Sequence, residues 1–149
     1  MRRLGPMLGV LLVLAAGCGH DPSTAPADPH SAATSQRPSA EEQHVRRAAQ
    51  TFWDEILTGQ GNNAYQLLSK RCQAIDPDFL GQVNELANRI TGGPQPFLTF
   101  EAHIHGDRAR ATYTFKTSAL NQRGDLWVFE DGGWRWDACD RKLGAKSKT

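Results

Sequence analysis

Few side chains in this sequence are placed to do acid–base chemistry. A general base in a protein interior is usually a carboxylate whose pKa is raised by desolvation. Asp54 and Glu55 fall on the polar side of a predicted helix, and Asp76 is placed to cap another helix. Asp137, near the end of the last predicted strand, is therefore the only acid that we expect to be buried. It is the one candidate for a catalytic base.

Two histidines with one residue between them, His103 and His105, point to the same side of a predicted strand, which is a possible geometry for metal ligands. The predicted strand pairing sets them opposite Arg110 and Arg108. Cationic neighbours disfavour a divalent ion, and only Glu101 offers a carboxylate close by. We therefore expect no metal site. The sequence also has no glycine-rich phosphate loop, nucleophile elbow or Ser-His-Asp arrangement, so we expect no cofactor.

The N-terminus indicates where the chain works. A basic start with Arg2 and Arg3 is followed by the apolar run LGVLLVLAAG over residues 8–17, and Cys18 comes directly after it. A basic segment, a short apolar segment and small residues before a cleavage point are typical of a secretory signal. The ending LAAGC resembles the lipobox of bacterial lipoproteins. This resemblance implies that residues 1–17 are removed and that Cys18 carries diacylglycerol on the extracytoplasmic face of the cell membrane.

Two acyl chains are enough for stable anchoring, since each buried methylene contributes about 0.8 kcal/mol. The alternatives are an ordinary cleaved signal, with Cys18 incidental, or an uncleaved anchor. The apolar run is shorter than the roughly 20 residues that a spanning helix needs. Residues 18–38 hold four prolines and no large apolar side chain, which predicts a disordered tether. We expect one domain over residues 39–142 and a polar tail over 143–149.

The charges of the chain nearly balance. The 149 residues include 17 basic and 16 acidic side chains, and loss of Arg2 and Arg3 with the signal would leave 15 basic ones against the same 16 acids. Binding to nucleic acid calls for a basic face with aromatic residues between the charges. We expect no nucleic-acid partner.

If Cys18 is acylated, Cys72 and Cys139 are the only cysteines left. Export would place both in an oxidising compartment, where a pair of cysteines in a small domain usually forms a disulfide. We therefore predict a bond between Cys72 and Cys139, which would contribute about 4 to 5 kcal/mol in the chain-entropy model. A nucleophilic thiol at Cys72, directly after Lys70 and Arg71, is the less favoured alternative, because basic side chains on a helix are usually just solvated.

Three helices come first in the predicted domain. The segment SAEE over residues 39–42 is a capping box, and apolar residues then recur at helical spacing as far as Gly59. A second, short helix is predicted over residues 64–72. Asp76, followed by a proline, opens the third helix, which ends at Gly92. All three are amphipathic, so each must pack against another element.

From Phe97 onward the apolar residues alternate, which predicts strands. A two-residue turn at Gly106 and Asp107 gives one consistent hairpin. Its expected pairs are Ile104 with Ala109, Ala102 with Ala111, Phe100 with Tyr113, and Leu98 with Phe115. Every apolar residue then falls on one face, and a shift of one residue would destroy that agreement.

The last two predicted strands are LWVF over residues 126–129, which is apolar on both faces as in a covered central strand, and WRWDAC over residues 134–139. A two-residue loop between them would place Trp134 and Trp136 beside Phe129 and Trp127. A three-residue loop would place Trp136 opposite Val128. The sequence leaves both loops open, and with them the face that Arg135, Asp137 and Cys139 occupy.

Three helices followed by a four-stranded antiparallel meander predict an α+β fold with the helices on one face of the sheet. The segments VRRAAQTFWDEILTGQG, NNAYQLLSKRC and LWVFEDGGWRWDAC, within residues 42–140, resemble the nuclear transport factor 2-like superfamily. The resemblance implies a curved, cystatin-like cone with a cavity between helices and sheet. Some members of the superfamily use this cavity for catalysis and others for binding, and relatives often dimerise through the outer sheet face.

Aromatic residues on faces expected to point inward would form an apolar pocket with two phenol groups as hydrogen-bonding handles. These residues are Trp53, Tyr65, Phe100, Tyr113 and Trp136. The alternative is that they simply fill the core.

An inward face rich in aromatic residues and poor in titratable groups favours a non-enzymatic domain that binds a small apolar ligand or a protein of the cell envelope. A homodimer is a further hypothesis. The competing hypothesis is an enzyme of the isomerase, dehydratase or cyclase type, with Asp137 as base and Tyr65 or Tyr113 as hydrogen-bond donor.

Overall fold

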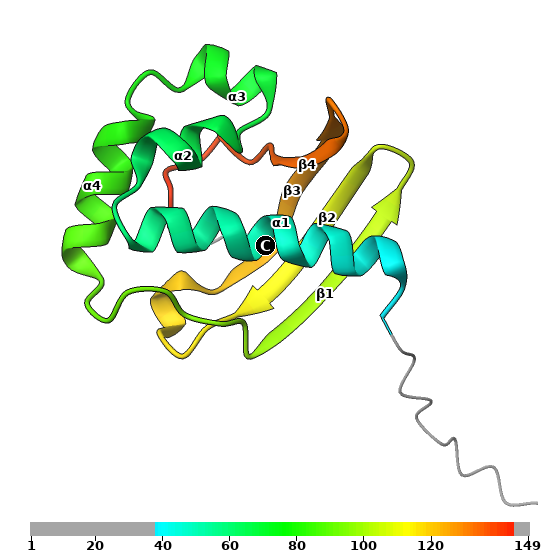
Figure 1. The fold of residues 1–149 in the computed structure, drawn as a ribbon, viewed down its shortest axis with the longest axis horizontal. Helices are drawn as coiled ribbons and strands as arrows, with labels where there is room; N and C mark the ends of the chain where they lie inside the picture. The colour runs from blue at the N-terminus through cyan, green and yellow to red at the C-terminus, as the bar shows by residue number, and fades with distance from the viewer. Residues whose placement is uncertain (1–37, 145–149) are drawn as a thin grey trace, which may run out of the picture. The chain divides into compact units, whose positions relative to one another are not determined.

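The computed structural model describes residues 38–144, which form an α+β domain with an antiparallel sheet (Figure 1). Its helices are α1 (Ala40–Leu57), α2 (Gly61–Gln66), α3 (Lys70–Ile75) and α4 (Phe79–Arg89), with a 3₁₀ turn η1 (Ser118–Leu120). Its strands are β1 (Thr99–His105), β2 (Arg108–Thr114), β3 (Gln122–Glu130) and β4 (Gly133–Trp136), paired in that order. Among these described helices, none is both long and apolar enough to cross a membrane. The predicted signal, the acylation of Cys18 and the tether up to residue 37 lie outside the described residues.

Helix α1 begins as its capping pattern predicts. The Ser39 hydroxyl oxygen accepts a hydrogen bond from the Glu42 backbone N–H at 3.0 Å, which satisfies one of the free donors of the first turn. One face of the helix is buried, and its residues are Val45, Ala49, Phe52, Trp53, Ile56 and Leu57. This face packs against the sheet, and Figure 1 shows α1 crossing in front of the strands.

The second predicted helix, over residues 64–72, is broken into α2 and α3, so the described chain has four helices where we expected three. The break occurs because the chain pairs with the last strand. Trp136 N–H donates to the Leu67 carbonyl oxygen, and Ser69 N–H donates to the Trp136 carbonyl oxygen, both at 2.9 Å. The Ser69 hydroxyl then accepts from Cys72 N–H at 3.1 Å and caps α3.

The expected cap of the third helix was wrong by two residues. Asp76 is the C-cap of α3, and its carboxylate accepts from the Gln82 side-chain amide at 3.0 Å. Asp78 is the N-cap of α4, although its side chain makes no capping hydrogen bond.

The β1–β2 hairpin confirms the predicted register. Phe100 pairs with Tyr113, Ala102 pairs with Ala111, and Ile104 pairs with Ala109, as predicted. Gly106 takes φ of 60° at the first position of the turn, where a two-residue hairpin of this kind favours glycine.

The outermost predicted pair of this hairpin, Leu98 with Phe115, is wrong. Strand β1 begins at Thr99, and Leu98 is 65% exposed. Phe97 takes the inner position instead, with its ring centre 5.0 Å from that of Phe115.

Strand β3 begins at Gln122, four residues earlier than the sequence pattern predicts. Ala111 pairs with Asp125 and Tyr113 pairs with Gln122, so β3 carries one extra residue at this point. Gly124 has φ of 61°, as glycine often does in a β-bulge. The bulge allows both Gln122 and Asp125 to be buried on the helix side of the sheet.

The β3–β4 loop has two residues, Asp131 and Gly132, with φ of 49° and 77°. Two successive positive φ values are typical of the type I′ turn that joins tight hairpins. The resulting pairs are Trp127 with Trp136, Val128 with Arg135, and Phe129 with Trp134. This arrangement corresponds to the shorter of the two loops that the sequence left open.

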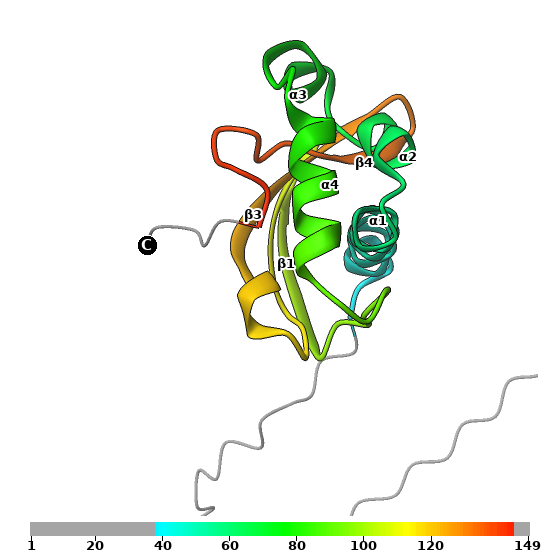
Figure 2. The same ribbon diagram turned by 90° about the vertical axis from the view of Figure 1, so that its left-hand side faces the viewer.

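Figure 2 shows the sheet nearly edge-on, with α1 and α2 on one side of the strands. Helix α4 packs against α1 and α2, whereas α3 lies at the end of the sheet near the segment that follows β4. That segment is part of the folded domain as far as the structure describes it. Leu143, expected at the start of the polar tail, is buried, and its N–H donates to the Gln82 side chain at 2.8 Å.

Candidate functional site

The five aromatic residues expected to line a pocket lie in one connected cluster of rings. Phe100 stacks on Tyr113 with 5.8 Å between ring centres, and Tyr113 lies 6.4 Å from Trp53. Phe52 and Phe79 connect these rings to Trp136 and Tyr65. Trp53, Tyr113 and Trp136 are almost completely buried, whereas Tyr65 and Phe100 are half-buried. The rings therefore pack mainly on one another.

One carboxylate, Asp125 on β3, is drawn into this cluster, with only 1% of its surface exposed. It accepts hydrogen bonds from the Tyr113 hydroxyl, from Trp136 Nε1 at 3.1 Å, and from the guanidinium of Arg141. Trp53 Nε1 in turn donates to the Tyr113 hydroxyl oxygen at 2.8 Å. The expectation that Asp137 is the only buried acid was therefore wrong.

Burial raises the pKa of the Asp125 carboxyl above its ordinary value, and the hydrogen bond from Tyr113 and the charge of Arg141 offset part of that rise. Burial also raises the pKa of Tyr113 well above its ordinary value, and the neighbouring Asp125 adds to the shift. The Tyr113 hydroxyl therefore keeps its proton and donates a hydrogen bond to Asp125. The network joins α1, β2, β3, β4 and the C-terminal segment through one buried carboxylate.

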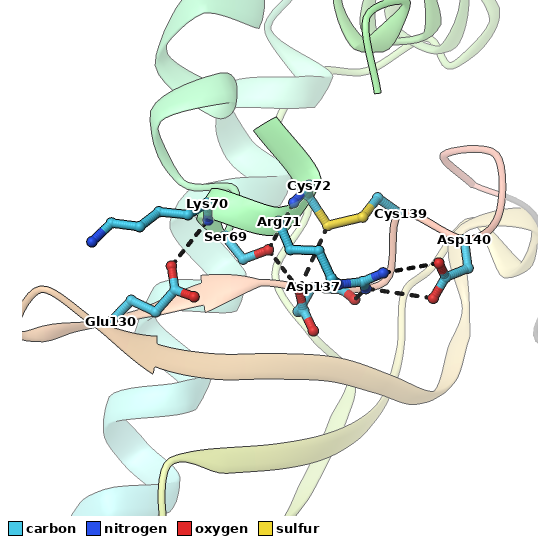
Figure 3. A network of polar contacts seen from close by, with 8 residues as sticks. All are labelled: Ser69, Lys70, Arg71, Cys72, Glu130, Asp137, Cys139 and Asp140. Carbon is cyan, nitrogen blue, oxygen red and sulfur yellow. Dashed lines mark hydrogen bonds and ion pairs between the residues drawn. A yellow bond between two sulfur atoms is a disulfide. The ribbon is translucent and has the colours of Figure 1, made fainter. Parts of the chain in front are cut away.

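Asp137 lies in a second polar cluster, just after β4 (Figure 3). Its Oδ1 atom accepts from the Ser69 hydroxyl at 2.5 Å and from Arg71 Nε at 3.0 Å. Arg71 also bonds Asp140 at 2.9 Å, and these two carboxylates raise the pKa of its guanidinium. The carboxylate of Asp137, whose side chain is 18% exposed, is thus already held by a hydroxyl and a cation.

Neither tyrosine proposed as a donor for Asp137 bonds to it. The Tyr65 hydroxyl donates to the Gln73 carbonyl oxygen at 3.0 Å, and the Tyr113 hydroxyl donates to Asp125. The structure therefore does not bring together the base and the donor that the enzymatic hypothesis requires.

The same cluster contains the predicted disulfide. Cys72 on α3 and Cys139 after β4 are bonded, with 5.5 Å between their α-carbons, which lies in the usual range. Figure 3 shows the bond beside Asp137, whose Oδ1 lies 3.8 Å from the Cys72 sulfur. Glu130 accepts from the Lys70 N–H at 3.0 Å on the other side of this cluster. The predicted pairing is confirmed, and it fixes α3 to the end of the sheet.

A hollow of about 490 Å³ lies on the sheet face turned away from α1. It is lined by His103, His105, Arg108, Ala109, Arg110 and Leu126. The pairing places His105 opposite Arg108 and His103 opposite Arg110, as the sequence predicts. His103 Nε2 lies 3.2 Å from a carboxylate oxygen of Glu101, and within residues 38–144 no group of three metal-ligating side chains is found.

A second hollow of about 190 Å³ adjoins the first and shares Arg110 and Leu126 with it. The rest of its lining is Gly124, Ala138, Asp140 and Arg141. The outer sheet face therefore carries a group of basic side chains, His103, His105, Arg108 and Arg110. The sequence pattern led us to consider this face as a metal site and as a dimer interface.

No family model matches the chain, and no curated protein or solved structure is significantly similar to it. The resemblance to the nuclear transport factor 2-like superfamily therefore rests on the sequence segments alone.

Asp125 was not predicted as a buried acid, although the sequence contains a signal for it. Asp125 precedes Trp127 by two residues, so alternation extended backward from Trp127 would have placed it on the inner face. The predicted strand began at Leu126, but Gly124 beside it could have marked a bulge, as a glycine next to a strand pattern can. Arg141 carries no such signal, because it follows the last strand in a segment without regular structure.

Proposed function

We propose that this chain is a lipid-anchored protein of the extracytoplasmic membrane face, with a nuclear transport factor 2-like domain that binds a partner or a small ligand and does not catalyse a reaction. The observation that carries the proposal is the hydrogen bonding of the two candidate catalytic acids, Asp125 and Asp137. Asp125 and Asp137 each accept hydrogen bonds from protein donors that include an arginine. A general base needs a lone pair directed at the substrate, and these carboxylates direct theirs at the protein.

The location is supported by the lipobox at Cys18 and by the disulfide between Cys72 and Cys139. A disulfide in a small domain fits an oxidising compartment outside the cytoplasm.

The binding surface is better supported on the outside of the domain than in its interior. A ligand entering the aromatic cluster would have to displace rings that contact one another, such as Trp53 and Tyr113. The hollow around Arg110 and Leu126 needs no such displacement. A partner of the cell envelope, or a small molecule with an apolar part, would meet the domain there.

The anchor is tested by expressing the full chain in a bacterial host and labelling it with a radioactive fatty acid. We expect the chain to be labelled and found in the membrane fraction, and Cys18→Ser to lose both properties. A Cys72→Ser/Cys139→Ser chain is the control and should keep the label. Labelling that persists in Cys18→Ser would contradict the anchor.

An enzyme of the isomerase, dehydratase or cyclase type stays the alternative. One observation makes Asp125 a better candidate for its catalytic base than Asp137. A carboxyl with a raised pKa beside a tyrosine hydroxyl is an arrangement that such enzymes use. Substrate would have to reach a side chain that is only 1% exposed.

Carbodiimide coupling followed by peptide mapping distinguishes the two functions. We expect the exposed Asp140 to be modified in the folded protein and Asp125 to be protected. Rapid modification of Asp125 under conditions that keep the protein folded would favour the enzyme.

A further inference from the structure

Strand pairing aligns the basic residues of the outer sheet face in two rows across three strands. One row contains His105, Arg108 and Val128, and the other contains His103, Arg110 and Leu126. Arg108 and Arg110 lie on the same strand with one residue between them, so they are about 7 Å apart along the strand. The four basic side chains are exposed, whereas Leu126 and Val128 are half-buried beside them.

These arginines have no carboxylate partner in the part of the chain that the structure describes. Neither Arg108 nor Arg110 takes part in any of the ion pairs or side-chain hydrogen bonds between residues 38 and 144. Two acids near this face have other partners, since Glu101 pairs with His103 and Asp140, which lines the smaller hollow, pairs with Arg71. The charges of the face are therefore available to an external anion.

The concentration of charge on this face contrasts with the nearly balanced charge of the whole chain, which has 17 basic and 16 acidic residues. Arginine binds phosphate oxygens through two parallel hydrogen bonds and is weakly hydrated, which favours it at phosphate-binding surfaces. The half-buried Leu126 adds apolar surface to the hollow of about 490 Å³ between the basic groups. A phosphate group attached to an apolar body fits this combination.

We propose that the outer sheet face, centred on Arg108 and Arg110, docks on the anionic phospholipid headgroups of the membrane that carries the chain's anchor. This inference rests on the proposed function, because it takes Cys18 as the point of attachment. Nineteen residues lie between Cys18 and Pro38, where the described domain begins, and a chain of that length spans at most about 70 Å. A tethered surface at this distance meets its target at an effective concentration in the millimolar range, so a weak affinity is enough.

The test uses the chain from residue 18 onward with Cys18→Ser, which has no acyl group. Its partition is measured by co-sedimentation with vesicles of phosphatidylcholine alone and with vesicles that contain 30% phosphatidylglycerol. We expect binding only to the phosphatidylglycerol vesicles, and weaker binding as salt is raised. Arg108→Gln/Arg110→Gln should reduce the partition coefficient about 30-fold, because each basic residue near an anionic surface contributes a factor of about five.

The matched control is Arg46→Gln/Arg47→Gln, which removes the same charge from exposed positions of α1 in the helix layer. This pair should bind like the parent chain. An equal loss in both variants, or equal binding to neutral vesicles, would overturn the proposal. Soluble glycerol phosphate separates a membrane surface from a site for a free anion.

We expect glycerol phosphate to compete only weakly at the same concentration of phosphate groups. Competition as strong as that of the vesicles would assign the hollow to a small anion and overturn membrane docking. Because the assayed chain has no acyl group, its result does not depend on the modification of Cys18. A failed labelling experiment and a failed vesicle experiment are therefore distinguishable.

Discussion

Arg141 is the cation that accompanies Asp125 into the core, and it comes from the irregular segment after β4. Its side chain is 21% exposed and that of Asp125 is 1% exposed, so the pair lies largely out of water. Removing one partner of a buried ion pair leaves an uncompensated charge, which usually costs more than the intact pair contributes. The pair therefore makes the fold sensitive to a residue near the end of the domain.

We predict that Arg141→Gln lowers the free energy of unfolding by about 3 kcal/mol at pH 7. Without the cation, the pKa of Asp125 in the folded state rises further above its value in the unfolded state. The folded variant then binds a proton over a wider pH range than the unfolded one, and stability falls as pH rises through that range. The loss in the free energy of unfolding should be largest at neutral pH and smallest near pH 4. Urea unfolding at both pH values measures it.

Arg89→Gln is the control for this measurement, because Arg89 forms only an exposed pair with Glu85 at 3.7 Å on the same helix. It should change the stability by no more than about 0.5 kcal/mol at either pH. An Arg141→Gln cost that is the same at pH 4 and pH 7 would show that Arg141 acts through packing and not through the charge of Asp125.

Some of the important residues could be predicted from the sequence and others could not, for identifiable physical reasons. Cys72 and Cys139 could be paired because few cysteines remain once Cys18 is set aside. Asp125 was missed because a polar residue inside a strand pattern was taken as the boundary of the strand. Arg141 could not be found, since a contact made from an irregular segment has no periodicity in the sequence.

Among the elements, the β3–β4 turn depends most directly on one residue type. Gly132 has φ of 77°, and an ideal Cβ at this position would meet no atom within 4 Å. A side chain would therefore be opposed by the backbone conformation and not by its neighbours.

We predict that Gly132→Ala destabilises the domain by about 1 kcal/mol and lowers its melting temperature by about 5 °C. Gly133→Ala is the control. Gly133 has no positive φ, and a Cβ there would lie 3.9 Å from the Arg135 side chain, so we expect little change. Calorimetry on both variants checks the prediction, and equal losses would contradict the role of the turn geometry.

The β1–β2 hairpin and the broken second helix show where prediction of the elements succeeds and fails. The hairpin register follows from local information, because alternation and a two-residue turn agree on one pairing, such as Phe100 with Tyr113. The break between α2 and α3 depends on Trp136, which lies 67 residues beyond Ser69 in the sequence. A distant strand that captures two backbone groups overrides a local helical pattern, and the local sequence contains no sign of it.

At the scale of the whole molecule, the disulfide connects the helical part of the chain to the end of the sheet. Its cysteines are 67 residues apart, and closing a loop of this length contributes about 4 kcal/mol in the chain-entropy model. We predict that Cys72→Ala/Cys139→Ala lowers the free energy of unfolding by about 2 to 5 kcal/mol. Urea unfolding with and without reductant checks this, since reductant should destabilise the parent chain and leave the variant unchanged.

A homodimer through the outer sheet face stays a prediction. The charges on this face give a physical argument against it. Two copies related by a twofold axis present the same patch to each other. On this face Arg108 and Arg110 of one copy would approach those of its partner, which costs electrostatic energy. The arrangement of charge thus favours an anionic surface over a second copy.

The loop closed by Cys72 and Cys139 contains α4 and all four strands. A single cut in the backbone anywhere inside this loop leaves the two pieces joined by sulfur. The stretch around Gly92, between α4 and β1, is exposed and irregular, so a protease would find a site there. A nicked molecule would run as one band on a gel until it is reduced, and a protein anchored at Cys18 would keep its whole sheet at the membrane after being cut.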